Sequence, residues 1–228
     1  MNMVIAIATF EWSRWEECVA SWNEKSYAKY PVAVAKRMDI LDAYQRIFEE
    51  KPYADVIAYV HDDVIVNEQD WDLRVLKEFE DPSVGLVGFG GASQHGSGDM
   101  YKSPYGLCQL GRLYFCSNMR NAEQHGERMT GVENSAVLDG FSIFVRRDVL
   151  VKAGGWPIGT PIGYFCYDMW ISCMTRRHGY KIKTVGVACD HLGGQSTGLN
   201  PNLRIDFEGA HRYMYDNFQD VLPCYVEP

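Results

Sequence analysis

The chain has 228 residues, of which 46% are hydrophobic and 23% charged, and its formal net charge is −8. This length suits one sizeable domain or two closely packed halves, and the apolar content is enough for an ordinary core, so extensive disorder is not expected. The acidic balance disfavours non-specific binding to nucleic acid or to anionic membranes, because both require a positive field.

The apolar runs and the cysteines bear on location. We find no run of about 20 apolar residues, so we expect no transmembrane segment. The N-terminal MNMVIAIATFEW has no basic leader and is expected to be a first strand rather than a signal peptide. The seven cysteines form no CxxC pair. That spacing disfavours a cysteine-based zinc site and predicts reduced, mostly buried thiols in a cytoplasmic protein.

Strands and helices alternate in the first part of the chain. Short apolar runs predict strands at 4–10, 32–35, 56–66 and 84–89. Apolar residues three or four apart predict helices at 12–25, 36–50 and 71–79. Alternation of this kind indicates βαβ units and a mostly parallel sheet.

The middle of the chain has poor periodicity. Residues 91–134 are rich in Gly, Ser, Asn, His and Met, and we expect irregular loops with a short strand near 113–116. A loop this long in a compact domain is usually functional or mobile. Beyond it, the pattern predicts strands at 137–145 and 181–188, and helices at 147–153, 167–178 and 203–218.

The stretch VIAYVHDDVIV covers residues 56–66. The buried strand predicted here is broken near His61, so Asp62 and Asp63 lie at a strand end. Ligands of open parallel sheets bind beyond the carboxyl ends of the strands, and Mg²⁺ typically takes one or two carboxylates together with phosphate oxygens. Adjacent strand residues point to opposite faces, so one aspartate is expected to bind metal and the other a sugar hydroxyl. A strand-end aspartate also commonly caps a turn, which leaves a structural role open.

Three later segments place reactive residues at the ends of predicted elements. Asp139-Gly140 opens a strand, and Gly140 would let a ligand approach the backbone closely. Asp168 lies at a helix start, where the helix dipole favours the carboxylate form. His191 follows a strand and precedes a Gly-Gly loop. Each has a structural alternative: a bulge at Gly140, a helix cap at Asp168, and an ordinary surface or core residue at His191.

The order of these features resembles the GT-A glycosyltransferases, especially the family-2-like group. The resemblance covers roughly residues 3–195 and rests on HDD, then DG before FSIFVRR, GGW, YD before a helix closed by HGYKI, and a final DH. It implies an α/β fold, a single GT-A (Rossmann-like) domain with a mostly parallel central sheet flanked by helices. It also implies a nucleotide-sugar-binding half at 1–92, an acceptor and catalytic half at 93–202, and a C-terminal helix and tail at 203–228.

The resemblance implies roles for the residues at the strand ends. Asp63 falls at the metal-binding position of the DxD motif, and Asp62 lies near the ribose or sugar. His191 resembles the C-terminal histidine that joins the metal or the diphosphate. His61 stands where the family has the first aspartate of DxD, which is a departure from the pattern.

Tyr167-Asp168 resembles the xED motif, in which the last residue, here Asp168, is the general base of inverting members. Tyr167 stands in place of the usual acidic residue, which is the second departure. The remaining donor-site positions implied by the resemblance are Thr9, Asp39, Asp139 and Gly140.

The implied activity is that of a hexosyltransferase-like enzyme. A sugar would pass from a nucleotide-diphosphate sugar, a UDP- or GDP-sugar, to a hydroxyl of a glycan or other acceptor. The implied cofactor is Mn²⁺ or Mg²⁺ at Asp63 and His191, with Asp168 as the base for inverting attack.

Two alternatives stay open. The two departures from the family pattern are compatible with a non-catalytic module that binds a nucleotide or glycan without turnover. His61, Asp63 and His191 also match the two-histidine, one-carboxylate triad of Fe(II)-dependent oxygenases. The alternating strands and helices disfavour this second alternative, because those enzymes are mainly all-β sandwiches.

Overall fold

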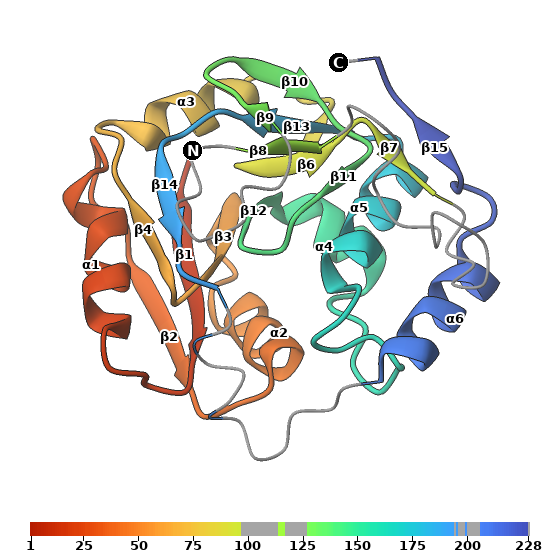
Figure 1. Ribbon diagram of the computed structural model, residues 1–228, viewed down its shortest axis with the longest axis horizontal. Coiled ribbons are helices and arrows are strands. Elements are labelled where there is room, and N and C mark those ends of the chain that lie inside the picture. The colour runs from red at the N-terminus through yellow and green to blue at the C-terminus, as the bar shows by residue number, and fades with distance from the viewer. Residues whose placement is uncertain (97–113, 117–126, 194, 196–198, 200–205, 228) are drawn as a thin grey trace.

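The computed structural model shows one large sheet with helices on both faces (Figure 1). The residues that the structure describes are 1–96, 114–116, 127–193, 195, 199 and 206–227. No helix in these ranges is long and apolar enough to cross a membrane.

The central sheet has seven strands in the order β10-β13-β5-β12-β3-β1-β2. The strands β2, β1, β3, β5 and β13 run in one direction, and β12 and β10 run in the opposite direction. This arrangement confirms the prediction of a mostly parallel sheet. The bounds of these strands are β1 (Met3–Thr9), β2 (Val32–Lys36), β3 (Val56–His61), β5 (Val84–Gly88), β10 (Val132–Asn134), β12 (Ser142–Arg146) and β13 (Lys181–Val185).

Smaller sheets extend from the central one. A four-stranded sheet has the order β11-β6-β8-β9, and two pairs are formed by β14 with β4 and by β15 with β7. Their bounds are β4 (Val64–Val66), β6 (Gly90–Ala92), β7 (Gln94–His95), β8 (Tyr114–Cys116), β9 (Glu127–Arg128), β11 (Val137–Leu138), β14 (Cys189–His191) and β15 (Cys224–Tyr225).

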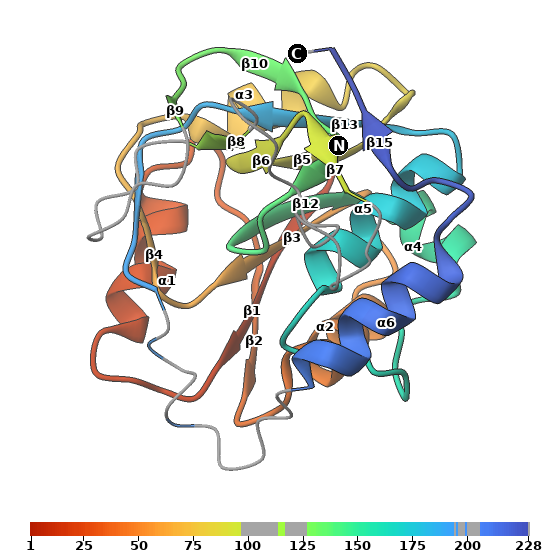
Figure 2. The same cartoon turned by 45° about the vertical axis from the view of Figure 1, so that its right-hand side comes forward.

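The helices form two layers, which Figures 1 and 2 show from two directions. The first layer contains α1 (Trp15–Glu24) and α3 (Trp71–Glu78). The second layer contains α2 (Ile40–Glu50), α4 (Arg147–Ala153), α5 (Tyr167–Arg177) and α6 (Phe207–Asn217). Arg177 at the end of α5 donates a hydrogen bond to the Asn217 carbonyl and forms an ion pair with Asp220, which holds α6 against α5.

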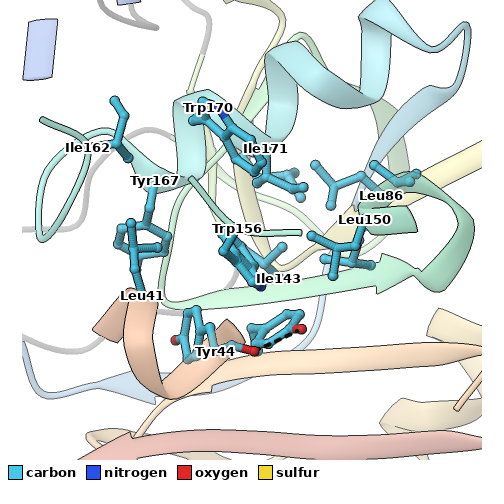
Figure 3. Close-up of a cluster of buried hydrophobic side chains, with 14 of the residues drawn as sticks. Leu41, Tyr44, Leu86, Ile143, Leu150, Trp156, Ile162, Tyr167, Trp170 and Ile171 are labelled. Atoms are coloured by element: carbon cyan, nitrogen blue, oxygen red, sulfur yellow. Dashed lines mark hydrogen bonds between the residues drawn. The ribbon is translucent and has the colours of Figure 1, made fainter. Parts of the chain in front are cut away.

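Strand β3 is apolar almost throughout because both of its faces are covered. Ile57 and Tyr59 pack toward α2, α4 and α5, whereas Val56, Ala58 and Val60 pack toward α1 and α3. Figure 3 shows the side of the second helix layer, where Tyr44 of α2 lies beneath Trp156 and Ile143. Both faces of β3 are therefore covered, so a site on this strand must lie at one of its ends.

Several predicted boundaries were wrong for local reasons. The helix predicted at 36–50 begins at Ile40, because Lys36 still pairs with Thr9 in the sheet and Arg37 has a positive φ of 56°. The strand predicted at 137–145 is two strands, β11 and β12. Short strands that the sequence did not predict include β6, β7, β10 and β14. The predicted start of the last helix, 203–205, lies outside the described residues.

Candidate active site

The turn after β3 presents two buried aspartates at the carboxyl end of the sheet. The backbone N–H of His61 donates to the Phe141 carbonyl (3.0 Å), and the indole N–H of Trp12 donates to the Asp62 carbonyl (3.1 Å). Asp62 and Asp63 are each 4% exposed. Because they lie in a turn and not within the strand, both reach the same cavity, which differs from the prediction that they point to opposite faces.

Strand pairing brings His191 to this turn from a distant part of the chain. β14 runs antiparallel to β4, with His191 opposite Val64, and the Leu192 N–H donates to the Asp63 carbonyl (2.8 Å). The ring of Phe141 stacks on the His191 imidazole, with centroids 5.0 Å apart and planes at 22°. The backbone and one aromatic ring therefore fix the position of His191.

His61, Asp63 and His191 each direct one potential ligand atom to a common point, and these atoms lie within 4.8 Å of one another. Oδ1 of Asp63 is 3.3 Å from Nε2 of His191 and 3.8 Å from Nδ1 of His61. This oxygen is buried and accepts no hydrogen bond of normal geometry from the described residues. A buried carboxylate oxygen without such a donor, facing two imidazoles, is an arrangement that a divalent cation would satisfy.

The charges of the three residues are coupled. Burial alone would raise the pKa of Asp63, but the close approach of the His191 and His61 imidazoles holds this pKa below its ordinary value. Burial alone would lower the pKa of His191, and the Asp63 carboxylate raises it above its ordinary value. Burial lowers the pKa of His61, which keeps this imidazole neutral and able to act as a ligand.

A cavity of about 550 Å³ opens directly beside these residues. Its walls come from the end of β1, the start of α2, the turn after β3 and the loop at 158–164. Among the described residues of the wall, the charged ones are acidic, and neither lysine nor arginine contributes. The acidic wall residues are Asp39, Asp42, Asp62, Asp63 and Asp206.

The structure separates the predicted site residues into two groups. Asp39, Asp62, Asp63 and His191 line the cavity. Of the described wall residues, none is Thr9, Asp139, Gly140 or Asp168. Thr9 is 1% exposed, and its hydroxyl accepts a hydrogen bond from the Glu11 N–H (2.9 Å).

Asp139 and Asp168 form an acidic pair beside the three-residue cluster. Burial raises the pKa of Asp168, the nearby Asp139 carboxylate raises it further, and the result is about 7. Backbone N–H groups of Met169, Asp168 and Gly140 lower this pKa, but by less than burial and Asp139 raise it. The prediction that the helix start keeps Asp168 a carboxylate was therefore wrong. Burial and the Asp139 carboxylate raise the pKa of Asp168 more than the helix start lowers it.

Gly140 has a different neighbour from the one expected. A Cβ atom at this position would lie 2.1 Å from Oη of Tyr167. The phenol of Tyr167 therefore occupies the space beside Gly140 that we expected a ligand to use. Its Oη lies 2.6 Å from Nε2 of His61.

The comparisons with known proteins concern the family and the fold of the chain. A family profile described as glycosyltransferase-like matches residues 15–191, which is most of the chain. The chain belongs to this glycosyltransferase-like family. No curated protein sequence matches it.

Solved structures show that this glycosyltransferase-like protein has the GT-A fold. GalNAc-T7 with UDP, GalNAc and Mn²⁺ is 13% identical with a TM-score of 0.59, and the match covers 84% of this chain and 44% of that one. The mannosyltransferase PcManGT from Pyrobaculum calidifontis, in complex with GDP-Man and Mn²⁺, is 14% identical with a TM-score of 0.55, covering 85% and 57%. The STIV protein A197 is 15% identical with a TM-score of 0.52, covering 86% and 87%.

The glycosyltransferase-like chain thus spans less than two thirds of two of these three proteins. At such low identity the likeness concerns the fold. The likeness confirms the α/β architecture and the GT-A resemblance. The roles of individual residues in this family member are argued from the geometry of its own site.

Sequence reasoning missed several residues of the glycosyltransferase-like site. Under the glycosyltransferase resemblance it assigned His61 only to a departure from the metal motif, although His61 joins Asp63 and His191 around the common point. The oxygenase alternative had already grouped these three residues, on the spacing His-x-Asp with a distant histidine. The cavity walls formed by Tyr44, Gln195 and the loop at 158–164 had no sequence signal, because only the folded chain brings them together.

Proposed function

We propose that this protein transfers a sugar from a nucleoside-diphosphate sugar to an acceptor hydroxyl, with a divalent metal at His61, Asp63 and His191. One observation carries the proposal: three ligand atoms converge in the wall of a sizeable cavity at the carboxyl ends of the sheet. The membership in a glycosyltransferase-like family and the GT-A fold support it. Two structural neighbours were solved with a nucleotide or nucleotide sugar and Mn²⁺.

The ligand atoms favour a particular kind of metal. Imidazole nitrogens suit transition ions, whereas Mg²⁺ prefers oxygen ligands and keeps several waters. Two imidazoles and one carboxylate are therefore better suited to Mn²⁺ than to Mg²⁺. When bound, the metal would supply Lewis-acid stabilisation for the charge that develops on the leaving diphosphate.

The absence of lysine and arginine from the described cavity wall makes this stabilisation important. A nucleoside diphosphate carries several negative charges, and the described wall adds Asp39, Asp42, Asp62 and Asp206 to them. Donor binding without a metal would bring like charges together at short range. We therefore propose that donor binding depends on the metal, with Asp39 and Asp62 accepting hydrogen bonds from the nucleoside or sugar.

Asp168 is the proposed general base. Its carboxylate takes the proton of the acceptor hydroxyl while that oxygen forms a bond to the anomeric carbon. The bond from this carbon to the diphosphate oxygen breaks, and its electron pair leaves with the diphosphate. One direct displacement inverts the anomeric configuration. A pKa of about 7 gives Asp168 a useful fraction of each protonation state near neutral pH.

The remaining predicted residues have supporting positions. Asp139 acts on the pKa of Asp168, and Gly140 leaves room for Tyr167. Thr9 ends β1 next to the cavity-lining residues Ala8 and Phe10. The division into two halves and a C-terminal tail, and the cytoplasmic location, stay predictions.

A thermal-shift experiment tests the donor site. UDP, GDP, CDP and dTDP are each added with and without Mn²⁺, and a ligand at a hundredfold excess over Kd stabilises the fold by about 2.7 kcal/mol. We expect metal-dependent stabilisation by at least one diphosphate, its loss in Asp63→Ala, and its retention in the control Asp216→Ala on the exposed side of α6. Stabilisation by none of the four would contradict the proposed donor site.

A turnover assay separates an enzyme from a module that only binds. Release of the free diphosphate from a bound nucleotide sugar, with or without an acceptor, supports the transferase. Metal-dependent binding of nucleotide sugars without hydrolysis or transfer to any acceptor in a broad panel would favour the non-catalytic module.

The oxygenase alternative shares the three-residue cluster but not the fold. His61, Asp63 and His191 do lie together, as that alternative requires. The fold around them is α/β with a mostly parallel sheet, whereas the alternative implied an all-β sandwich. Iron-dependent consumption of an oxoacid would be needed to favour it over sugar transfer.

A further inference from the structure

The two departures from the family motifs contact each other. His61 stands in place of the first aspartate of DxD, and Tyr167 stands in place of the acidic residue of xED. In the structure, Oη of Tyr167 lies 2.6 Å from Nε2 of His61. Two unusual residues from separate motifs thus form one hydrogen bond.

The two ring nitrogens of His61 face different neighbours. Nδ1 faces the proposed metal site, at 3.4 Å from Nε2 of His191 and 3.8 Å from Oδ1 of Asp63. Nε2 faces away from that site, toward Tyr167. A histidine that binds metal through one nitrogen is held in the correct tautomer by the hydrogen bond that its other nitrogen donates.

Tyr167 is itself held firmly. Its side chain is 5% exposed, and its ring lies 6.1 Å from that of Tyr44 and 6.5 Å from that of Trp156. Figure 3 shows the phenol reaching from the start of α5 toward Leu41 and Tyr44 of α2. Gly140 completes the arrangement, because any larger residue would place its Cβ 2.1 Å from Oη.

We infer that Tyr167 is a positioning residue for the metal centre. Its phenol oxygen accepts the Nε2–H of His61, and this hydrogen bond leaves the lone pair of Nδ1 for the metal. Gly140 makes this contact possible by leaving the space that the phenol occupies. The inference rests on the proposed function, because it concerns the metal site named there.

The protonation state of Tyr167 agrees with this role. Burial, followed by the nearby Tyr44 and two aspartates, raises the pKa of Tyr167 well above its ordinary value, so the phenol remains neutral. A neutral phenol oxygen still accepts a hydrogen bond from an imidazole N–H.

The test measures Mn²⁺ affinity of the full metal-free chain by isothermal titration calorimetry, with no nucleotide present. Tyr167→Phe keeps the ring and removes only the hydroxyl. We expect it to weaken Mn²⁺ binding about 10-fold to 100-fold, the usual loss for an outer partner of a metal ligand. A role in packing alone would lower the melting temperature without this selective loss of metal affinity.

The matched control is Tyr180→Phe. The Tyr180 hydroxyl also accepts a hydrogen bond, from Nζ of Lys152 (3.0 Å), but its side chain packs on Gly85 near the start of β5, at the opposite end of the sheet. This variant removes the same atom type and should bind Mn²⁺ like the native chain. Gly140→Ala, which displaces the phenol, should weaken binding as Tyr167→Phe does.

A second readout needs no variant. Nitrogen NMR of the native chain with Zn²⁺, a diamagnetic substitute, should show His61 protonated at Nε2 and bound through Nδ1. A proton on Nδ1 would overturn the inference even if Tyr167→Phe does not fold.

The other outcomes are also decisive. Folded Tyr167→Phe with a Mn²⁺ dissociation constant within twofold of the native value overturns the positioning role and leaves the metal site intact. A native chain that binds no Mn²⁺ overturns the metal site itself, and the positioning role with it. These two failures are distinguishable because the first appears only in the variant.

Discussion

Oδ1 of Asp63 lies 3.3 Å from Nε2 of His191, and a short pair of antiparallel strands holds the two residues at this distance. Asp63 immediately precedes β4, and His191 is the last residue of β14. The proposed metal site thus depends on two three-residue strands outside the central sheet. Its geometry is set by backbone pairing, which explains how a buried carboxylate and a distant imidazole remain in register.

Removal of His191 should weaken metal binding strongly. We expect His191→Ala to lower Mn²⁺ affinity by at least about tenfold, since even an outer partner of a metal ligand is worth that much. Calorimetric titration with Mn²⁺ measures the effect. His178→Ala, at the far end of α5, is the control and should leave the affinity unchanged. Equal affinities in His191→Ala and the native chain would remove His191 from the ligand set.

Replacement of the proposed base should slow turnover and spare donor binding. Asp168→Asn keeps the shape of the side chain but cannot accept the proton, so we expect kcat to fall about 10²-fold to 10⁴-fold. Asp148→Asn, an exposed aspartate in the first turn of α4, is the matched control. Near-normal turnover in a folded Asp168→Asn would exclude Asp168 as the base.

The pH profile should report the acidic pair. A base must be deprotonated, so the rate with native protein should rise with pH through about 7, the pKa of Asp168. Asp139 raises this pKa after burial does. Asp139→Asn should therefore move the rising limb of the kcat/KM profile to lower pH, while a charge-independent role of Asp139 would leave the midpoint in place.

The same pKa makes a prediction about stability. The pKa of Asp168 in the folded chain, about 7, lies above its ordinary value of 3.8, so the native state binds the proton more tightly than the unfolded state. The resulting stabilisation is fully present below the ordinary value and is lost as pH rises through about 7. As pH rises from 5 to 8, denaturant unfolding should show the free energy of unfolding of Asp168→Asn increasing relative to that of the native chain. A constant difference would contradict this linkage.

The cysteines should differ sharply in reactivity. Burial raises the pKa of Cys18 and of Cys173 to about 12, and raises the pKa of Cys166 further. Cys189 is also buried, whereas Cys224 is partly exposed. Iodoacetamide at pH 8 should therefore modify Cys224 of this group first, as peptide mass spectrometry would detect. Rapid modification of Cys18 or Cys173 in the folded chain would show that the core opens readily.

Much of the fold was determined by local patterns of the sequence. The apolar run of β3 predicts a buried strand because both faces of such a strand need apolar side chains. The alternation of strands with helices predicts a parallel sheet, and a parallel sheet collects its strand ends at one edge, where Asp63 was expected to act. These signals are periodicities and strand-end positions, which the chain carries residue by residue.

The tertiary structure alone decided which of these residues meet and with what charge. The pairing of β4 with β14 brings His191 to Asp63, and the approach of α5 brings Tyr167 to His61. The pKa of Asp168 followed burial and the neighbouring Asp139 rather than the helix start that the sequence showed. Proximity and burial arise from contacts between distant segments, and a local pattern does not contain them.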